Sequence, residues 1–233
     1  MACVIATGVA FQGSGIFARP LISVETERPE LALTFDDGPN AQVTLEILTL
    51  LEAEGHRATF FVVGERARDQ PSLLREIPQR GHLLANHSLR HSFLTPFRRP
   101  QQLSEELEET SQIIARVVGN APRWFRPPVG LLSPRVASAA RRAALELVAW
   151  TASARDGVAS RTVADAIRRL EPHLVRGAIL VLHDGAMGNH ASLAPAILKE
   201  LLPRLRERGL TSVTLDQLLR SASDSHSAEA RAS

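Results

Sequence analysis

The chain lacks the features that mark disulfide-rich, nucleic-acid-binding or membrane-spanning proteins. Cys3 is the single cysteine, which excludes an internal disulfide. Lys199 is the only lysine, the formal net charge is +2, and no basic stripe alternates with aromatic residues, so we expect no nucleic-acid partner. No apolar stretch is long and unbroken enough to cross a bilayer. The 14 glycines and 14 prolines are scattered, so no long linker divides the chain and we expect one domain.

What is present is an alternation of short apolar runs with amphipathic stretches over 233 residues. Stripes such as Val43, Ile47 and Leu51 have helical spacing. Strand–helix alternation predicts parallel strands with helices packed outside them, and thus an α/β barrel with seven or eight strands. The strand candidates are residues 31–35, 58–63, 82–85, 124–126, 145–151, 178–183 and 211–213.

Two adjacent carboxylates, Asp36 and Asp37, end the first apolar run inside the motif TFDDGP. Neighbouring side chains of a strand point to opposite faces, so both can share a site only where the strand ends and the backbone bends, as Gly38-Pro39 allows. Like charges that lie close together repel, so a cation or strong donors must be near. The motif therefore predicts a metal site at the mouth of the barrel.

Further polar groups follow later strands, where a parallel barrel collects its reactive side chains. His87 and His91 are spaced i, i+4, so a helical turn would put both imidazoles on one face. Two imidazoles and one carboxylate suit Zn²⁺ or a related divalent ion. Arg126 begins a stiff Pro-Pro loop and is expected to pair with Asp36, while His183 closes another apolar run.

These segments together resemble the NodB-homology polysaccharide deacetylases, a carbohydrate esterase family 4-like group. The resemblance covers about residues 31–215 and rests on TFDDGP, HSLRH, RPPVG, the segment around Trp150 and Asp156, and LHD. It implies a distorted (β/α)7-type parallel barrel, and one divalent metal, Zn²⁺ or Co²⁺, that serves to remove N- or O-acetyl groups from a carbohydrate. The implied partner is an N-acetylated glycan or oligosaccharide.

The resemblance also implies a role for each matching residue. Asp37, His87 and His91 match the metal ligands, and Asp36 matches the general base that activates the metal-bound water. Arg126 matches the partner of that base.

On the other side of the site, His183 matches the general acid and Asp156 the carboxylate that orients it. The residues expected to contact substrate are Pro128, Val129, Gly130, Trp150 and Val181. Val129 stands where the family commonly has tyrosine, which leaves its backbone N–H as the expected oxyanion donor. Gly157 stands where tryptophan is frequent, which opens one wall of the groove.

The chain divides, on this interpretation, into three parts. Residues 1–25 pack on the barrel or are the remnant of an anchor, residues 26–220 form the deacetylase-like domain, and residues 221–233 form a disordered tail. Residues 1–18 lack a basic start and are interrupted by polar residues, so they make no convincing signal peptide. The compartment, cytoplasmic or cell-envelope associated, and the oligomeric state stay open.

Two other functions stay open beside deacetylation. The same scaffold resembles amidohydrolases that deformylate lipid-linked sugars or cleave non-sugar amides, and a fold does not fix a substrate. A catalytically silent barrel that binds glycan or metal is an alternative of another class. Whether the protein releases acetate or formate distinguishes deacetylation from deformylation. Bound metal without any deacylation would favour the silent barrel.

Overall fold

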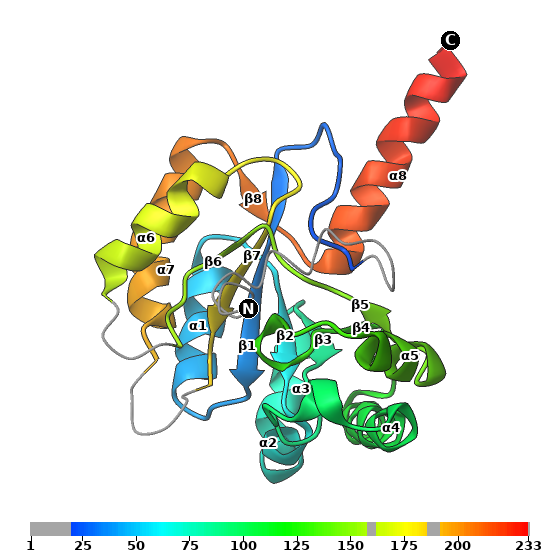
Figure 1. The fold of residues 1–233 in the computed structure, drawn as a ribbon. Coiled ribbons are helices and arrows are strands. Elements are labelled where there is room, and N and C mark those ends of the chain that lie inside the picture. Colours follow the sequence, from blue (N-terminus) through cyan, green and yellow to red (C-terminus); the bar gives the residue numbers. More distant parts are fainter. Residues whose placement is uncertain (1–19, 158–161, 186–191, 233) are drawn as a thin grey trace, which may run out of the picture.

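The computed structural model describes residues 20–157, 162–185 and 192–232 (Figure 1). Its eight strands form one curled sheet in the order β5-β4-β3-β2-β1-β7-β6, with β8 paired to β1, and each strand pair is parallel. The strands are β1 (Glu30–Gly38), β2 (Ala58–Val62), β3 (Leu83–Asn86), β4 (Trp124–Phe125), β5 (Glu146–Leu147), β6 (Ala152–Ser153), β7 (Ile179–His183) and β8 (Thr211–Ser212). The expected distorted (β/α)7-type barrel is confirmed.

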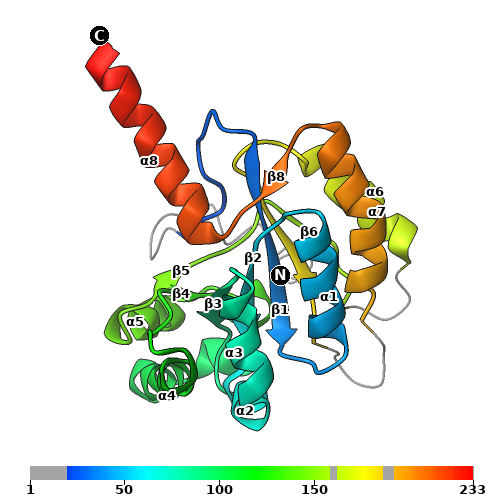
Figure 2. The same cartoon turned by 180° about the vertical axis from the view of Figure 1, so that it is seen from behind.

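Helices cover the outside of this sheet, as the front and back views show (Figures 1 and 2). The helices α1, α6 and α7 cover one side and α2 to α5 the other, while α8 projects from the body. The α-helices are α1 (Val43–Ala53), α2 (Gly64–Asp69), α3 (Pro71–Gln79), α4 (Pro100–Val118), α5 (Pro134–Arg142), α6 (Val163–Leu170), α7 (Ala194–Glu207) and α8 (Leu215–Ala232). Three short 3₁₀ helices are η1 (Thr95–Phe97), η2 (Pro128–Gly130) and η3 (Glu171–His173).

The central strand β1 directs its odd and even residues to different sides. Leu31, Leu33 and Phe35 are buried in the large core beneath the helices. Ala32 belongs to a second core that also contains Phe61 from β2. Because side chains alternate along a strand, Thr34 and Asp36 face the same inner side as Ala32. A buried acidic side chain at the end of β1 is thus directed into the barrel.

The prediction of one strand over residues 145–151 is wrong. This run contains only the two-residue strand β5, and the next strand, β6, begins after it at Ala152. The gap between them is bridged by the first described residues: Leu21 N–H donates to Leu147 O (2.8 Å), and Ala149 N–H donates to Leu21 O (2.8 Å). We call this bridged gap the seam. Pairing with a segment more than a hundred residues away splits the run, and local apolar pattern does not reveal such pairing.

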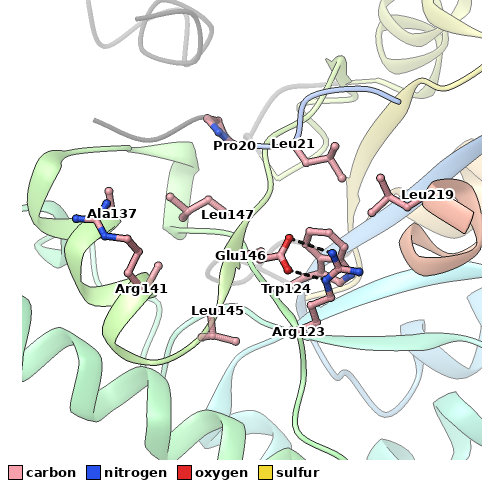
Figure 3. Close-up of a pocket in the computed structure, with 11 residues that line it drawn as sticks. Pro20, Leu21, Arg123, Trp124, Ala137, Arg141, Leu145, Glu146, Leu147 and Leu219 are labelled. Carbon is pink, nitrogen blue, oxygen red and sulfur yellow. Dashed lines mark hydrogen bonds and ion pairs between the residues drawn. The ribbon is translucent and has the colours of Figure 1, made fainter. Parts of the chain in front are cut away.

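A hollow of about 530 Å³ lies beside the seam (Figure 3). Trp124, Leu147 and Leu219 contribute apolar walls, and Pro20 and Leu21 line the same hollow. Arg123 and Glu146 also line it and form an ion pair, with Arg123 Nε 2.8 Å from Glu146 Oε1.

The structure describes the two ends of the chain to different extents. Residues 1–19 lie outside the described residues, whereas residues 21–24 contact the sheet through the seam and through Val24 N–H, which donates to Gly177 O (2.9 Å). The helix α8 continues to Ala232, over most of the segment expected to be a disordered tail. The alanines, glutamate and arginine near its end are good helix formers, which favours helix there. Within the described part of the chain, none of the helices has the length and apolar character needed to cross a bilayer.

Candidate metal centre and active site

Four parallel strands end at the same edge of the barrel, and each brings a predicted site residue there. Asp36 on β1 lies in register with His183 on β7, so these two side chains are neighbours across the strand pair. His87 follows β3, and Arg126 follows β4. Asp36, His87 and Arg126 are nearly or fully buried, which makes their mutual contacts decisive for the chemistry.

The group that could hold a metal ion is Asp37, His87 and His91, whose candidate ligand atoms lie within 4.8 Å of one another. Asp37 Oδ1 is 3.3 Å from His87 Nε2 and 3.0 Å from His91 Nε2. The other ring nitrogen of His87, Nδ1, lies 2.8 Å from Arg126 O. A carbonyl can only accept, so Nδ1 carries a proton and Nε2 is the ring nitrogen directed at Asp37.

This arrangement fits a cation. Asp37 Oδ1 is buried and has no well-aligned hydrogen bond from any described residue. Burial alone raises the pKa of Asp37, but His87 and His91 hold that pKa well below its usual range, so the carboxyl is ionised. A carboxylate oxygen and two imidazoles with small separations are the donor set of a tetrahedral Zn²⁺ or similar site.

The backbone at and beside this trio is unusual. Asp37 (φ 73°), Ser88 (φ 68°) and His91 (φ 52°) all adopt the left-handed region. Non-glycine residues rarely adopt it, and such residues cluster at functional sites. Residues 87–91 form a loop and not a helical turn, and His91 N–H donates to Ser88 Oγ (3.1 Å) within it. The two rings nevertheless come together, with centroids 5.1 Å apart.

Asp36 and Arg126 form a buried pair, as expected. Arg126 Nη1 donates to Asp36 Oδ1 (2.7 Å) and to Thr34 Oγ1 (2.8 Å), while Nη2 donates to Ala149 O (2.9 Å). The guanidinium also lies 4.1 Å above the Phe61 ring. These contacts leave Asp36 Oδ2 on the side of the metal trio, 3.9 Å from His87 Nε2.

His183 and Asp156 form the second pair. His183 Nδ1 lies 2.7 Å from Asp156 Oδ1, and His183 N–H donates to Asp156 Oδ2 (3.0 Å). Burial lowers the pKa of His183, but the hydrogen bond and charge of Asp156, with Asp36 and Asp37 adding to them, raise it to about 9. The imidazole is therefore protonated near neutral pH and can supply a proton.

The expected substrate contacts lie in two places. Val129 (φ 50°) is 42% exposed at the mouth, and Pro128 beside it is buried. Gly130 is required where it stands, because a Cβ there would overlap the Trp150 ring. Val181 is fully buried on β7, two residues before His183 and therefore on the same side of the sheet beneath it.

Sequence reasoning missed several residues that contact this site. Thr34 binds Arg126, and Arg66 of α2 donates through Nη1 to Asp37 O. Asp184 is fully buried and accepts a hydrogen bond from Thr44. The signal for Asp184 was its place directly after His183, and for Thr34 its place in the inner-facing register of Asp36. Arg66 left no signal in the sequence.

Comparison with known proteins decides the family. A family model described as "Polysaccharide deacetylase" matches residues 23–148. The chain belongs to the polysaccharide deacetylase family. It is a hydrolase of carbon–nitrogen bonds other than peptide bonds, of polysaccharide deacetylase type.

Similar proteins carry related names. A "Chitooligosaccharide deacetylase" of Sinorhizobium fredii is 35% identical over 201 residues, covering 82% of this chain and 93% of the relative. A "Peptidoglycan-N-acetylglucosamine deacetylase" of Bacillus cereus is 32% identical over 192 residues, covering 82% and 88%. A solved family 4 acetyl xylan esterase from Clostridium thermocellum, in complex with a cobalt ion, has a TM-score of 0.74 at 31% identity and covers 82% of this chain and 90% of its own.

Proposed function

We propose that this polysaccharide deacetylase family member removes N- or O-acetyl groups from a carbohydrate with a divalent metal, Asp36 as general base and His183 as general acid. The observation that carries the proposal is the buried, ionised Asp37 oxygen, which has two imidazole nitrogens 3.0 and 3.3 Å away and no well-aligned donor among the described residues. Two pairs lie beside it, the buried Asp36 with Arg126 and the partly buried His183 with Asp156, and they support an acid–base function at the same place.

The cation that we propose for Asp37, His87 and His91 is Zn²⁺, with Co²⁺ as the other candidate. Bound there, it would lower the pKa of a water molecule and polarise the scissile carbonyl. The nitrogen-rich donor set suits either ion, and the cobalt ion of the esterase relative adds support for Co²⁺.

Asp36 is suited to accept a proton. Its Oδ1 accepts a hydrogen bond from Arg126, which fixes the orientation of the carboxylate plane. Its Oδ2 faces the metal trio and is the oxygen available to take a proton from the attacking water. Loss of this base is expected to lower the rate by on the order of 10²–10⁴-fold.

His183 is suited to the opposite task. The Asp156 carboxylate orients its ring through Nδ1, so Nε2 is the atom that donates to the leaving amine or alkoxide. The backbone N–H of Val129, in the loop after β4, is the proposed protein donor to the tetrahedral oxyanion. Trp150, packed against Gly130, is the proposed wall of the acetyl pocket.

The proposed substrate is an N-acetylated glycan or oligosaccharide. Support comes from the relatives named for peptidoglycan N-acetylglucosamine and for chitooligosaccharides. The acyl group is tested separately, because a formylated or lipid-linked substrate would use the same metal, base and acid.

The test is release of acetate from N-acetylglucosamine oligomers after EDTA treatment and reconstitution with Zn²⁺ or Co²⁺. We expect metal-dependent release that Asp36→Asn abolishes and Glu207→Gln leaves intact, since Glu207 is exposed at the end of α7, away from the strand ends that carry the site. Turnover of Asp36→Asn at the wild-type rate would refute the assignment of the base. Formate release without acetate release would point to a deformylase, and stoichiometric metal with no deacylation on a broad panel would point to a silent barrel.

A further inference from the structure

The turn that follows Asp36 and Asp37 is held from the far side by the segment after His183. Asp184 N–H donates to Asp36 O (3.1 Å), and Gly185 N–H donates to the same oxygen (3.3 Å). The side chain of Asp184 is fully buried, and none of the proposed chemical steps uses it. A buried carboxyl that has no part in the reaction needs another explanation.

Its partner is a threonine on the first helix. Thr44 Oγ1 lies 2.5 Å from Asp184 Oδ2 and accepts a hydrogen bond from Asn40 N–H (2.8 Å). Because the threonine oxygen already accepts from Asn40, its own proton is free to point to the carboxyl. Asn40 in turn receives the N–H groups of Gln42 and Val43 on its side-chain oxygen, both at 3.1 Å. One hydrogen-bonded chain thus runs from Asp184 to the start of α1.

The Asp184 carboxyl also fills the space that a side chain at Gly38 would occupy. A Cβ added at Gly38 would overlap Asp184 Oδ2, so the backbone directly after Asp37 lies flat against this group. Residues 38–42 are therefore confined between the Asp184 carboxyl and the first turn of α1. Asp37 itself has a φ of 73°, a conformation that an unconfined aspartate adopts only rarely.

We propose that Asp184 and Thr44 form a positioning pair that fixes the turn after Asp37 and thereby directs the Asp37 carboxylate toward His87 and His91. Among the described residues, the hydrogen bonds of the two side chains join them to each other and to Asn40, and the pair acts on the trio through the backbone of Gly38 and Asp36. The inference rests on the proposed metal centre, because it assigns the pair an effect on metal affinity. Partners of this outer kind change metal affinity by about 10–100-fold when they are removed.

The test replaces the hydroxyl and keeps the shape. Thr44→Val removes the donor to Asp184 and the acceptor for Asn40, whereas Thr44→Ser keeps both. Thr49→Val is the matched control, because Thr49 is exposed on the same helix and bonds only to Leu45 O, four residues earlier (3.0 Å). Affinity for Co²⁺ is measured by calorimetry without substrate, together with the visible absorption of the bound Co²⁺, and kcat and KM follow on the reconstituted enzyme.

We expect Thr44→Val to weaken Co²⁺ affinity by about tenfold, because the turn that holds Asp37 loses a support. We also expect kcat to fall while KM stays within about twofold of the wild-type value. Thr44→Ser and Thr49→Val should match wild type in both. Asp184→Asn, which keeps the volume of the side chain, should weaken Co²⁺ affinity in the same direction and covers the case in which Thr44→Val does not fold.

Wild-type Co²⁺ affinity and spectrum in both Thr44→Val and Asp184→Asn would overturn the positioning role. The affinity experiment needs no substrate, so it also separates this inference from the proposed function. Weaker metal binding in the variants would support the pair even if the wild-type protein released no acetate. Acetate release with unchanged metal binding in the variants would support the function and reject the pair.

Discussion

Replacing Asp156 by Asn tests whether this carboxylate keeps His183 protonated. In the wild type, His183 N–H and His183 Nδ1–H bond to the two carboxylate oxygens of Asp156 (3.0 and 2.7 Å). The substitution is nearly isosteric, but the amide of Asn is neutral and its single oxygen can accept from only one of these two donors. We expect the alkaline limb of the profile of kcat/KM against pH to move to lower pH.

The size of the shift follows from the bond that is lost. A hydrogen bond from a cationic donor to a carboxylate contributes about 1.5–3 kcal/mol, and one pKa unit corresponds to about 1.4 kcal/mol, so the pKa of His183 should fall by about one to two units. Because Asp156 raises the wild-type pKa to about 9, protonated His183 is present below that pH and is lost as the pH rises through it. In the variant the same loss occurs near neutral pH. A cation bound at Asp37 lowers both values, so the prediction concerns their difference.

The assay is kcat/KM between pH 6 and pH 10 for wild type, Asp156→Asn and the control Glu207→Gln, all loaded with the same metal. The deficit of Asp156→Asn should grow with pH, by about tenfold for each unit between the two pKa values. A deficit of constant size across the whole range would refute the electrostatic role of Asp156 and leave only an orienting one. An alkaline limb at the wild-type position would mean that another group sets it.

Three further outcomes are expected. Arg126→Met leaves the Asp36 carboxylate buried without its partner and should lower the free energy of unfolding by about 3–5 kcal/mol in urea titrations; a loss below about 1 kcal/mol would contradict the importance of the pair. Gly130→Ala pushes a methyl group into the Trp150 ring at a residue whose φ is +66°. We expect kcat/KM to fall by on the order of 10²-fold and the tryptophan emission to change. An unchanged kcat/KM would refute the proposal that Trp150 is a wall of the acetyl pocket. Burial lowers the pKa of His82 from 6.5 to about 4, so the unfolded chain takes up this proton first as the pH falls, and stability should drop by about 2 kcal/mol between pH 7 and pH 5. His82→Asn should abolish that part of the drop, as unfolding at the two pH values would show, and a drop equal to wild type would refute it.

The class of fold, and the gathering of Asp36, His87 and His183 at one edge, could be predicted from the sequence because both depend on local pattern, whereas Asp156 was singled out only by the family resemblance. The apolar run before Asp36 marks a buried strand, and the Gly-Pro turn marks its end. Parallel strands place such ends at one edge, so the sequence alone predicts His87 and His183 beside Asp36. The structure brings these residues together, along with Arg126 and Asp156.

Other features depend on contacts between distant parts of the chain, which no local pattern reveals. The split between β5 and β6 follows from pairing with Leu21. The Thr44–Asp184 bond joins residues 140 positions apart. His56 and His82 are both buried, and each accepts a backbone N–H on Nδ1. Sequence alone does not distinguish a buried histidine that accepts a backbone N–H from a histidine that is exposed.

The seam also sets limits for protein engineering. A barrel whose edge strands have only two residues each offers little template for another chain to pair with, which protects it against edge-to-edge aggregation. That protection depends on the short stretch from Leu21 to Val24, whose bonds engage Leu147 O, Ala149 N–H and Gly177 O. In a shortened version that starts after Val24, all three backbone groups would lose their hydrogen-bond partners, and the exposed strand edge could pair with another chain. Tags and fusion partners are therefore best joined upstream of Pro20, with this stretch left intact.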